Sequence, residues 1–139
     1  MKKVDHIAIA VSDLEKAKKT FKKLGFSFEE THEVSAMKVE TAFAKIGESH
    51  IELITPTSKD STVKKFLQKK GEGIHHICFE VTNIEASIQK MKEKGFQPIY
   101  DKPQKGAQGL VTFLHPKETH GVLVELIQRG FGEREHNHE

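Results

Sequence analysis

Cysteine is almost absent from this chain, since Cys78 is the only one in 139 residues. An intrachain disulfide is therefore excluded, which fits a reducing compartment. Long apolar runs are also absent: no stretch approaches the length of a membrane-spanning helix, and the N-terminal residues 1–5 lack the apolar segment of a secretory signal. We therefore expect a cytoplasmic protein that does not bind membranes.

A strong excess of one charge is missing as well. The 22 basic and 20 acidic residues leave a formal net charge of +2, and no aromatic-interleaved basic patch is present. This balance gives no reason to expect a nucleic-acid partner. The hydrophobic fraction of 36% with 30% charged residues is typical of a soluble globular domain.

What the chain does contain is an internal repeat. The segment Asp5–Val11 returns seventy residues later as His75–Val81, and Ile51–Ile54 is answered by Val124–Ile127, seventy-three residues on. Each half has about seventy residues, which is near the lower limit for a stable core. The halves are therefore expected to pack on each other or on another subunit.

The repeat predicts an α+β fold made of two tandem βαβββ modules, about 4–56 and 73–128, within a single domain over residues 1–129. Alternating β-branched residues indicate strands, and apolar residues at helical spacing followed by glycine indicate helices. A short helix is expected in the connector, and the polar, His-rich tail 130–139 is expected to be flexible. The expected strands are 4–11, 27–32, 38–46, 50–55, 74–81, 97–101, 110–115 and 122–128, and the expected helices are 14–24, 61–68 and 84–94.

Each module places one histidine in its first strand and one glutamate in its last. Strand alternation separates His6 from the aliphatic residues that would pack under a helix, and His76 holds the equivalent position. Glu52 and Glu125 lie inside apolar runs, where a charged side chain is costly unless it is paired or ligated. Taken singly, each residue could simply face solvent. Because the same types recur at the same register, we predict one divalent metal held by all four, with Zn²⁺, Co²⁺, Mn²⁺ or Ni²⁺ suiting these ligands better than Ca²⁺.

The neighbours of these residues are expected to play lesser parts. Asp5 and His75 should point to the opposite face as hydrogen-bonding groups. His50 should lie at the rim of the site, on the same face as Glu52. Cys78 is expected to be a small apolar filler, because it has no partner cysteine.

The paired modules with His and Glu resemble the vicinal oxygen chelate (glyoxalase/bleomycin resistance/dioxygenase) superfamily, in which a curved, cup-like mixed sheet surrounds a metal site. Within it, the chain is most similar to the methylmalonyl-CoA epimerase family, from Val4 to Gln128. The segments that carry this likeness are Asp5–Val11, Ile51–Pro56, Ser61–Leu67, Gly73–Val81 and Gly106–Leu126.

The resemblance implies an isomerase that interconverts (2R)- and (2S)-methylmalonyl-CoA by removing the proton alpha to the thioester, through a metal-stabilised enolate. It implies His6, His76 and Glu125 as metal ligands, with Glu52 at a fourth position that some members fill with glutamine. Cobalt is the implied metal. Glu40 matches the position of a proposed catalytic glutamate, and Glu125 is the second candidate acid/base. A homodimer that binds an acyl-CoA is implied as well.

Lysines in the second module could meet the CoA phosphates, or could serve solubility alone, and the sequence favours neither reading. Lys102, Lys105 and Lys117 lie in its expected loops, where Gly106 and Gly109 would let the backbone approach a ligand closely.

Three other functions fit the same fold. A glyoxalase I-type lactoylglutathione lyase uses similar ligands, but the Ser61–Leu67 and Gly106–Glu125 segments look more like the epimerase. An extradiol dioxygenase is usually larger, and Tyr100 is the only tyrosine here. A metal-free binding module would generally lack the ligands that this chain keeps.

Overall fold

The computed structural model describes residues 1–130, so the predicted flexible tail lies, apart from Gly130, outside the described residues. Contacts divide the chain into two compact units. The first unit is His6–His75, and the second unit combines Met1–Asp5 with the described residues from His76 on. No helix within residues 1–130 has the length and apolar character needed to cross a membrane.

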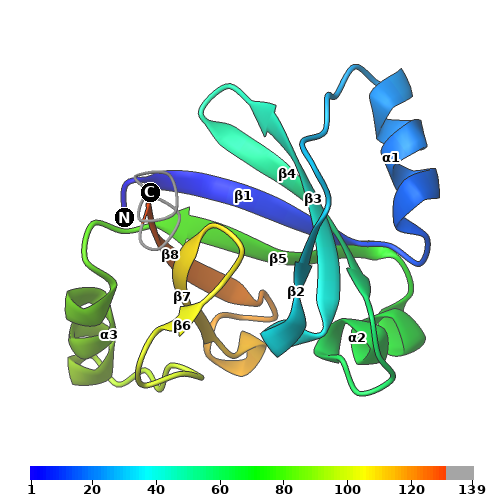
Figure 1. The fold of residues 1–139 in the computed structure, drawn as a ribbon. Coiled ribbons are helices and arrows are strands. Elements are labelled where there is room, and N and C mark those ends of the chain that lie inside the picture. Colours follow the sequence, from blue (N-terminus) through cyan, green and yellow to red (C-terminus); the bar gives the residue numbers. More distant parts are fainter. Residues whose placement is uncertain (131–139) are drawn as a thin grey trace. The chain divides into compact units, whose positions relative to one another are not determined.

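The first unit contains four paired strands. Strand β1 (Lys3–Ala10) pairs in parallel with β4 (Ser49–Pro56) through its residues 6–10, β4 pairs antiparallel with β3 (Val39–Ile46), and β3 pairs antiparallel with β2 (His32–Val34). Helix α1 (Leu14–Lys23) connects the first two strands in the chain (Figure 1). The order along the chain is therefore βαβββ.

The second unit repeats this topology. Strand β5 (Gly73–Glu80) pairs in parallel with β8 (Val124–Arg129), β8 pairs antiparallel with β7 (Gly109–Leu114), and β7 with β6 (Gln104–Lys105). Helix α3 (Ile84–Glu93) follows β5 as α1 follows β1. The predicted α+β class and the two βαβββ modules are confirmed.

Two predicted strands were wrong. Instead of a strand over 27–32, the first unit has one isolated bridge at Phe28 and then the short β2. Residues 97–101 form no strand, and β6 lies further on. In this second segment Pro98 has no N–H to donate, and the hydroxyl of Thr112 bonds both the N–H and the carbonyl of Tyr100. The Thr112 side chain thus makes hydrogen bonds to Tyr100 that the backbone of a neighbouring strand would make in a regular sheet.

Helices α1 and α3 cover one face of each unit's sheet. The carboxylate of Asp13 accepts the Lys16 N–H, and the amide oxygen of Asn83 accepts the Ala86 N–H, which caps the two helices in the same way. Behind them lie two apolar clusters, formed by Val11, Leu14, Ala42 and Leu53 in the first unit and by Val81, Ile84, Ile88 and Leu126 in the second. The opposite face of each sheet is therefore the one left for polar chemistry.

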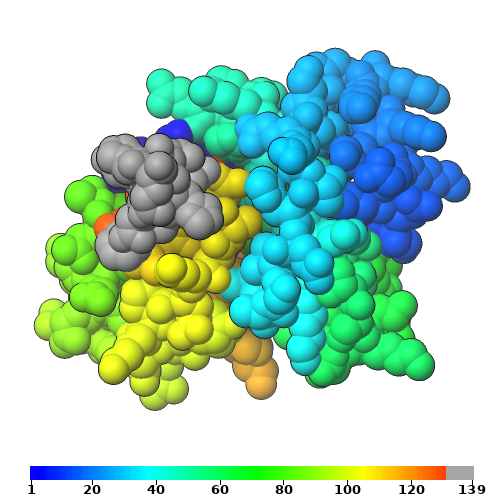
Figure 2. Space-filling model, in the orientation of Figure 1, coloured from blue at the N-terminus to red at the C-terminus, as the bar shows by residue number. Residues whose placement is uncertain are grey.

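The connector helix α2 (Thr62–Lys70) packs on that opposite face in the first unit. Its Val63 joins a cluster with Ala8, Ala10, Val39 and Ile54. Figure 2 shows the cyan surface of the β2–β3 region directly against the green surface of the α2 region.

The start of α2 is fixed by polar contacts. The buried Ser61 hydroxyl accepts the Val63 N–H, and Asp60 bonds Lys38 and Ser58. Hydrogen bonds from Lys38 and Ser58 lower the pKa of Asp60 to about 2. Lys38 itself adopts a left-handed conformation (φ 60°) at the entry to β3. These contacts hold the helix against the sheet.

Gly109, in β7, allows a test of how closely β7 and β8 pack in the second unit. A Cβ atom there would lie 2.4 Å from the carbonyl oxygen of Gln128 on the neighbouring strand, which is backbone and cannot step aside. We expect Gly109→Ala to lower the free energy of unfolding by about 1–3 kcal/mol, as overpacking does. Gly73→Ala is the matched control, because nothing lies within 4 Å of its Cβ position. Urea unfolding of both variants measures the difference, and equal stability would contradict the prediction.

Candidate active site

The first unit brings His6 and Glu52 together. Residues 6–10 of β1 and strand β4 run side by side, and Nε2 of His6 lies 3.2 Å from a carboxylate oxygen of Glu52. Both residues are buried, at 3% and 6% exposure. Phe43 on β3 lies opposite Glu52 on β4 in the register. Its ring contacts the His6 ring edge-on, with 5.5 Å between the ring centroids. An aromatic ring therefore flanks this pair.

The second unit builds the same arrangement from the repeated residues. Nε2 of His76 lies 2.8 Å from a carboxylate oxygen of Glu125, and both residues are buried. Phe113 stands opposite Glu125 in the register, and its ring meets the His76 ring edge-on at 5.8 Å. The repetition seen in the sequence thus extends to side-chain geometry.

Each pair joins an imidazole nitrogen to a carboxylate in a place that water barely reaches. Burying a carboxylate is costly unless a cation or hydrogen-bond donors compensate it. An imidazole beside a carboxylate forms a mixed N/O donor set, which suits a divalent transition metal. The donor chemistry and burial of each pair therefore fit the predicted metal.

Glu40 lies on the other side of the first unit's sheet. The unbroken β3–β4 register pairs Glu40 with Thr55, and it pairs Phe43 with Glu52. Alternate residues of a strand face opposite sides, so Glu40 faces away from the Glu52 side. Its counterpart in the second unit, Leu110, packs in the cluster under α3. The structure therefore does not bring Glu40 together with His6 and Glu52.

The other neighbours have definite partners. Asp5, fully buried in the second unit, receives hydrogen bonds from the Arg129 guanidinium on both carboxylate oxygens. His75 contacts the Phe66 ring edge-on at 4.9 Å. His50, opposite His6 in the register, contacts Phe43 at 6.0 Å. Cys78 is fully buried, as expected for a small filler.

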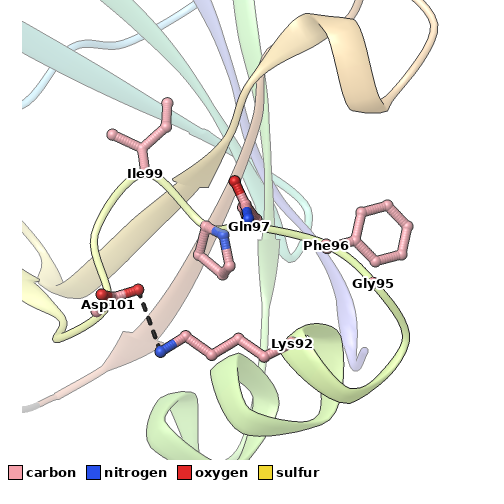
Figure 3. Close-up of a pocket in the computed structure, with 7 residues that line it drawn as sticks. Lys92, Gly95, Phe96, Gln97, Ile99 and Asp101 are labelled. Carbon is pink, nitrogen blue, oxygen red and sulfur yellow. Dashed lines mark ion pairs between the residues drawn. The ribbon is translucent and has the colours of Figure 1, made fainter.

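The predicted ligands do not line the pocket of Figure 3. That pocket, about 560 Å³, lies in the second unit beside the end of α3, and its lining includes Phe96, Gln97 and Ile99. Lys92 and Asp101 form an ion pair of 3.1 Å within it. The three lysines considered for phosphate binding, Lys102, Lys105 and Lys117, are all exposed.

The sequence did not single out Thr41, a buried polar residue on the same sheet face as His6 and Glu52. The signal for it was present, because the two-residue turn Gly47-Glu48 sets Ile46 against Ser49 and so fixes the face of every residue in β3. That register places Thr41, and not Glu40, on the side of Glu52.

Comparison with known proteins decides the family. A sequence model of the glyoxalase/bleomycin resistance protein/dioxygenase superfamily matches residues 5–114. Human mitochondrial methylmalonyl-CoA epimerase is 43% identical over 129 residues, covering 91% of this chain and 73% of the human protein. The chain belongs to this superfamily, within the methylmalonyl-CoA epimerase family.

Other members of the family agree with this placement. An ethylmalonyl-CoA/methylmalonyl-CoA epimerase of Cereibacter sphaeroides is 38% identical, with 91% of this chain and 97% of that protein covered. A solved structure of a Streptomyces coelicolor methylmalonyl-CoA epimerase variant, in complex with 2-nitronate-propionyl-CoA, has a TM-score of 0.91 at 37% identity and covers 94% and 96% of the two chains. The fold, the family and the epimerase class inferred from the sequence are confirmed.

Proposed function

We propose that this protein is a metal-dependent epimerase that interconverts (2R)- and (2S)-methylmalonyl-CoA. The observation that carries the proposal is the pair of buried His–Glu contacts, His6–Glu52 and His76–Glu125, at equivalent positions of the two units. The choice of an acyl-CoA substrate rests on family membership, since the relatives named above are epimerases of malonyl-type CoA esters.

The four residues of these contacts are the proposed ligands of one divalent ion, with Co²⁺ as the first choice and Mn²⁺, Ni²⁺ or Zn²⁺ as alternatives. Such an ion would supply Lewis-acid stabilisation of negative charge during proton removal. The residues themselves orient the donors. Phe43 and Phe113 press edge-on against the two imidazoles, which limits their rotation and keeps water away.

Epimerisation needs one group to take a proton from carbon 2 and another to deliver a proton on the opposite face. Glu125, whose carboxylate lies 2.8 Å from Nε2 of His76, is our candidate for one of these groups. The catalytic role of Glu40 stays a prediction, and its position on the helix side of β3 weighs against it. Activity of the Glu40→Gln variant decides this point: retention of turnover would remove Glu40 from the mechanism.

The proposal also includes a cytoplasmic homodimer. The small size of each unit supports association, because a core of about seventy residues is marginal on its own. Sedimentation equilibrium of the purified protein measures this directly.

Deuterium exchange at carbon 2 of methylmalonyl-CoA in D₂O tests the activity. We expect protein loaded with Co²⁺ to exchange this proton and to form the other epimer, and we expect chelation to abolish both. Absence of exchange with fully loaded protein would overturn the epimerase proposal and direct the next assay to the methylglyoxal–glutathione hemithioacetal. Exchange that survives complete metal removal would overturn the metal dependence alone.

A further inference from the structure

Thr41, in β3 of the first unit, carries a buried polar group that nothing so far explains. The residue is 1% exposed, and within residues 1–130 its hydroxyl has no hydrogen-bond partner. Leaving a buried hydroxyl without a bond is costly, so native proteins rarely retain one without a reason. The hydroxyl is therefore available to a group that the described residues do not supply.

The position of Thr41 indicates what that group is. In the β3–β4 register Thr41 stands opposite Ile54, and Phe43 stands opposite Glu52, so Thr41 and Glu52 are diagonal neighbours on one face. Such neighbours have Cα atoms about 7–8 Å apart, within reach of one another's side-chain surroundings. The same face bears the His6–Glu52 contact. The hydroxyl is thus part of the surroundings of the proposed site.

The second unit shows that the fold itself does not need a hydroxyl here. Val111 pairs with Ile127 just as Thr41 pairs with Ile54, and Phe113 pairs with Glu125 as Phe43 pairs with Glu52. Val111 is equally buried, at 1% exposure. A valine of nearly the same shape therefore fills the equivalent place, and threonine adds only its hydroxyl.

Thr112 shows how this chain treats a buried threonine that serves structure. It is fully buried, and its hydroxyl donates to the Tyr100 carbonyl at 2.9 Å and accepts the Tyr100 N–H at 3.3 Å. By register it lies on the helix side of its sheet, with Leu126 opposite. Thr41 differs in both respects, since it faces the His–Glu side and bonds to nothing in the described chain.

We propose that Thr41 is a substrate-contacting residue, whose hydroxyl donates a hydrogen bond to an oxygen of the bound acyl group. This inference rests on the proposed function. A donor beside that group stabilises the negative charge that its oxygens carry or develop when the proton leaves carbon 2. Because solvent does not reach the hydroxyl, this contact requires the surrounding side chains to separate when the acyl group enters.

The test compares Thr41→Val, Thr41→Ser and the control Thr112→Val as metal-loaded proteins. We expect Thr41→Val to reduce kcat/KM for epimerisation about ten- to hundredfold, the loss typical of a hydrogen bond to a charged oxygen. Thr41→Ser should recover most of this activity. The melting temperature of Thr41→Val should stay equal or rise, because no bond is lost on substitution, whereas Thr112→Val should melt lower.

The division between kcat and KM identifies the oxygen. A fall in kcat alone places the bond on the oxygen that gains charge in the reaction, and a rise in KM alone places it on the malonyl carboxylate. Unchanged kcat and KM in Thr41→Val, with active wild-type protein, would overturn the inference and leave the epimerase proposal standing. Inactive wild-type protein would overturn both.

Discussion

Replacing His76 with alanine is expected to remove both bound metal and activity. His76 and Glu125 form one of the two buried contacts on which the proposed site depends, and alanine offers no nitrogen ligand in place of the imidazole. We expect kcat/KM to fall at least about 10²–10³-fold, as when a main electrostatic group of an active site is lost. Steady-state kinetics and the metal content of dialysed protein, measured by mass spectrometry, give the two readouts.

His75→Ala is the matched control for this experiment. It removes an imidazole one position earlier on β5, where the ring contacts Phe66 instead of a glutamate. This variant should keep its metal and most of its activity. If His76→Ala also keeps both, the two His–Glu contacts are local ion pairs, and the proposed metal site is wrong.

His6→Ala carries the same expectation from the other half of the repeat. If the two modules supply one ion, loss of either histidine should empty the site, although the two belong to different units. If instead each pair acts alone, the two variants would lose stability separately and keep partial metal content. Measuring both variants therefore tests whether the duplication built one site or two.

The sequence predicted the parts of this protein that follow from repetition and alternation. The recurrence of His and Glu at fixed offsets singled out the four residues that form the two His–Glu contacts, because period-two alternation in a strand decides which side chains share a face. Their role as metal ligands stays a prediction. The catalytic role of Glu40 came from the resemblance and stays a prediction. The β3–β4 register, counted back from the Gly47-Glu48 turn, places Glu40 on the face of β3 away from Glu52, since one step along a strand moves a side chain to the other face.

Contacts between distant segments could not be predicted in this way. The bonds from Arg129 to Asp5 join residues 124 positions apart, and no periodic pattern links them. The edge strands were also misplaced, because a side chain such as Thr112 can bond the backbone in place of a neighbouring strand. Such choices depend on packing in three dimensions, which local propensity does not specify.

The contact between Arg129 and Asp5 is expected to give the largest effect on stability. Asp5 is fully buried, and the Arg129 guanidinium bonds both of its carboxylate oxygens and also the Gln108 side chain. Removing one partner of a buried ion pair withdraws the compensation of the remaining charge. We expect Arg129→Met to lower the free energy of unfolding by about 3–5 kcal/mol, measured by urea denaturation at neutral pH.

A double variant separates loss of charge compensation from loss of packing. If the cost arises from the buried Asp5 carboxylate, adding Asp5→Asn to Arg129→Met should recover part of the stability, because an amide is cheaper to bury than a carboxylate. If the cost arises from the lost aliphatic part of Arg129, the second substitution should recover nothing. Since Asp5 directly precedes His6 in β1, metal content that stays low in the double variant although stability recovers would show that this ion pair also helps to position the proposed ligand.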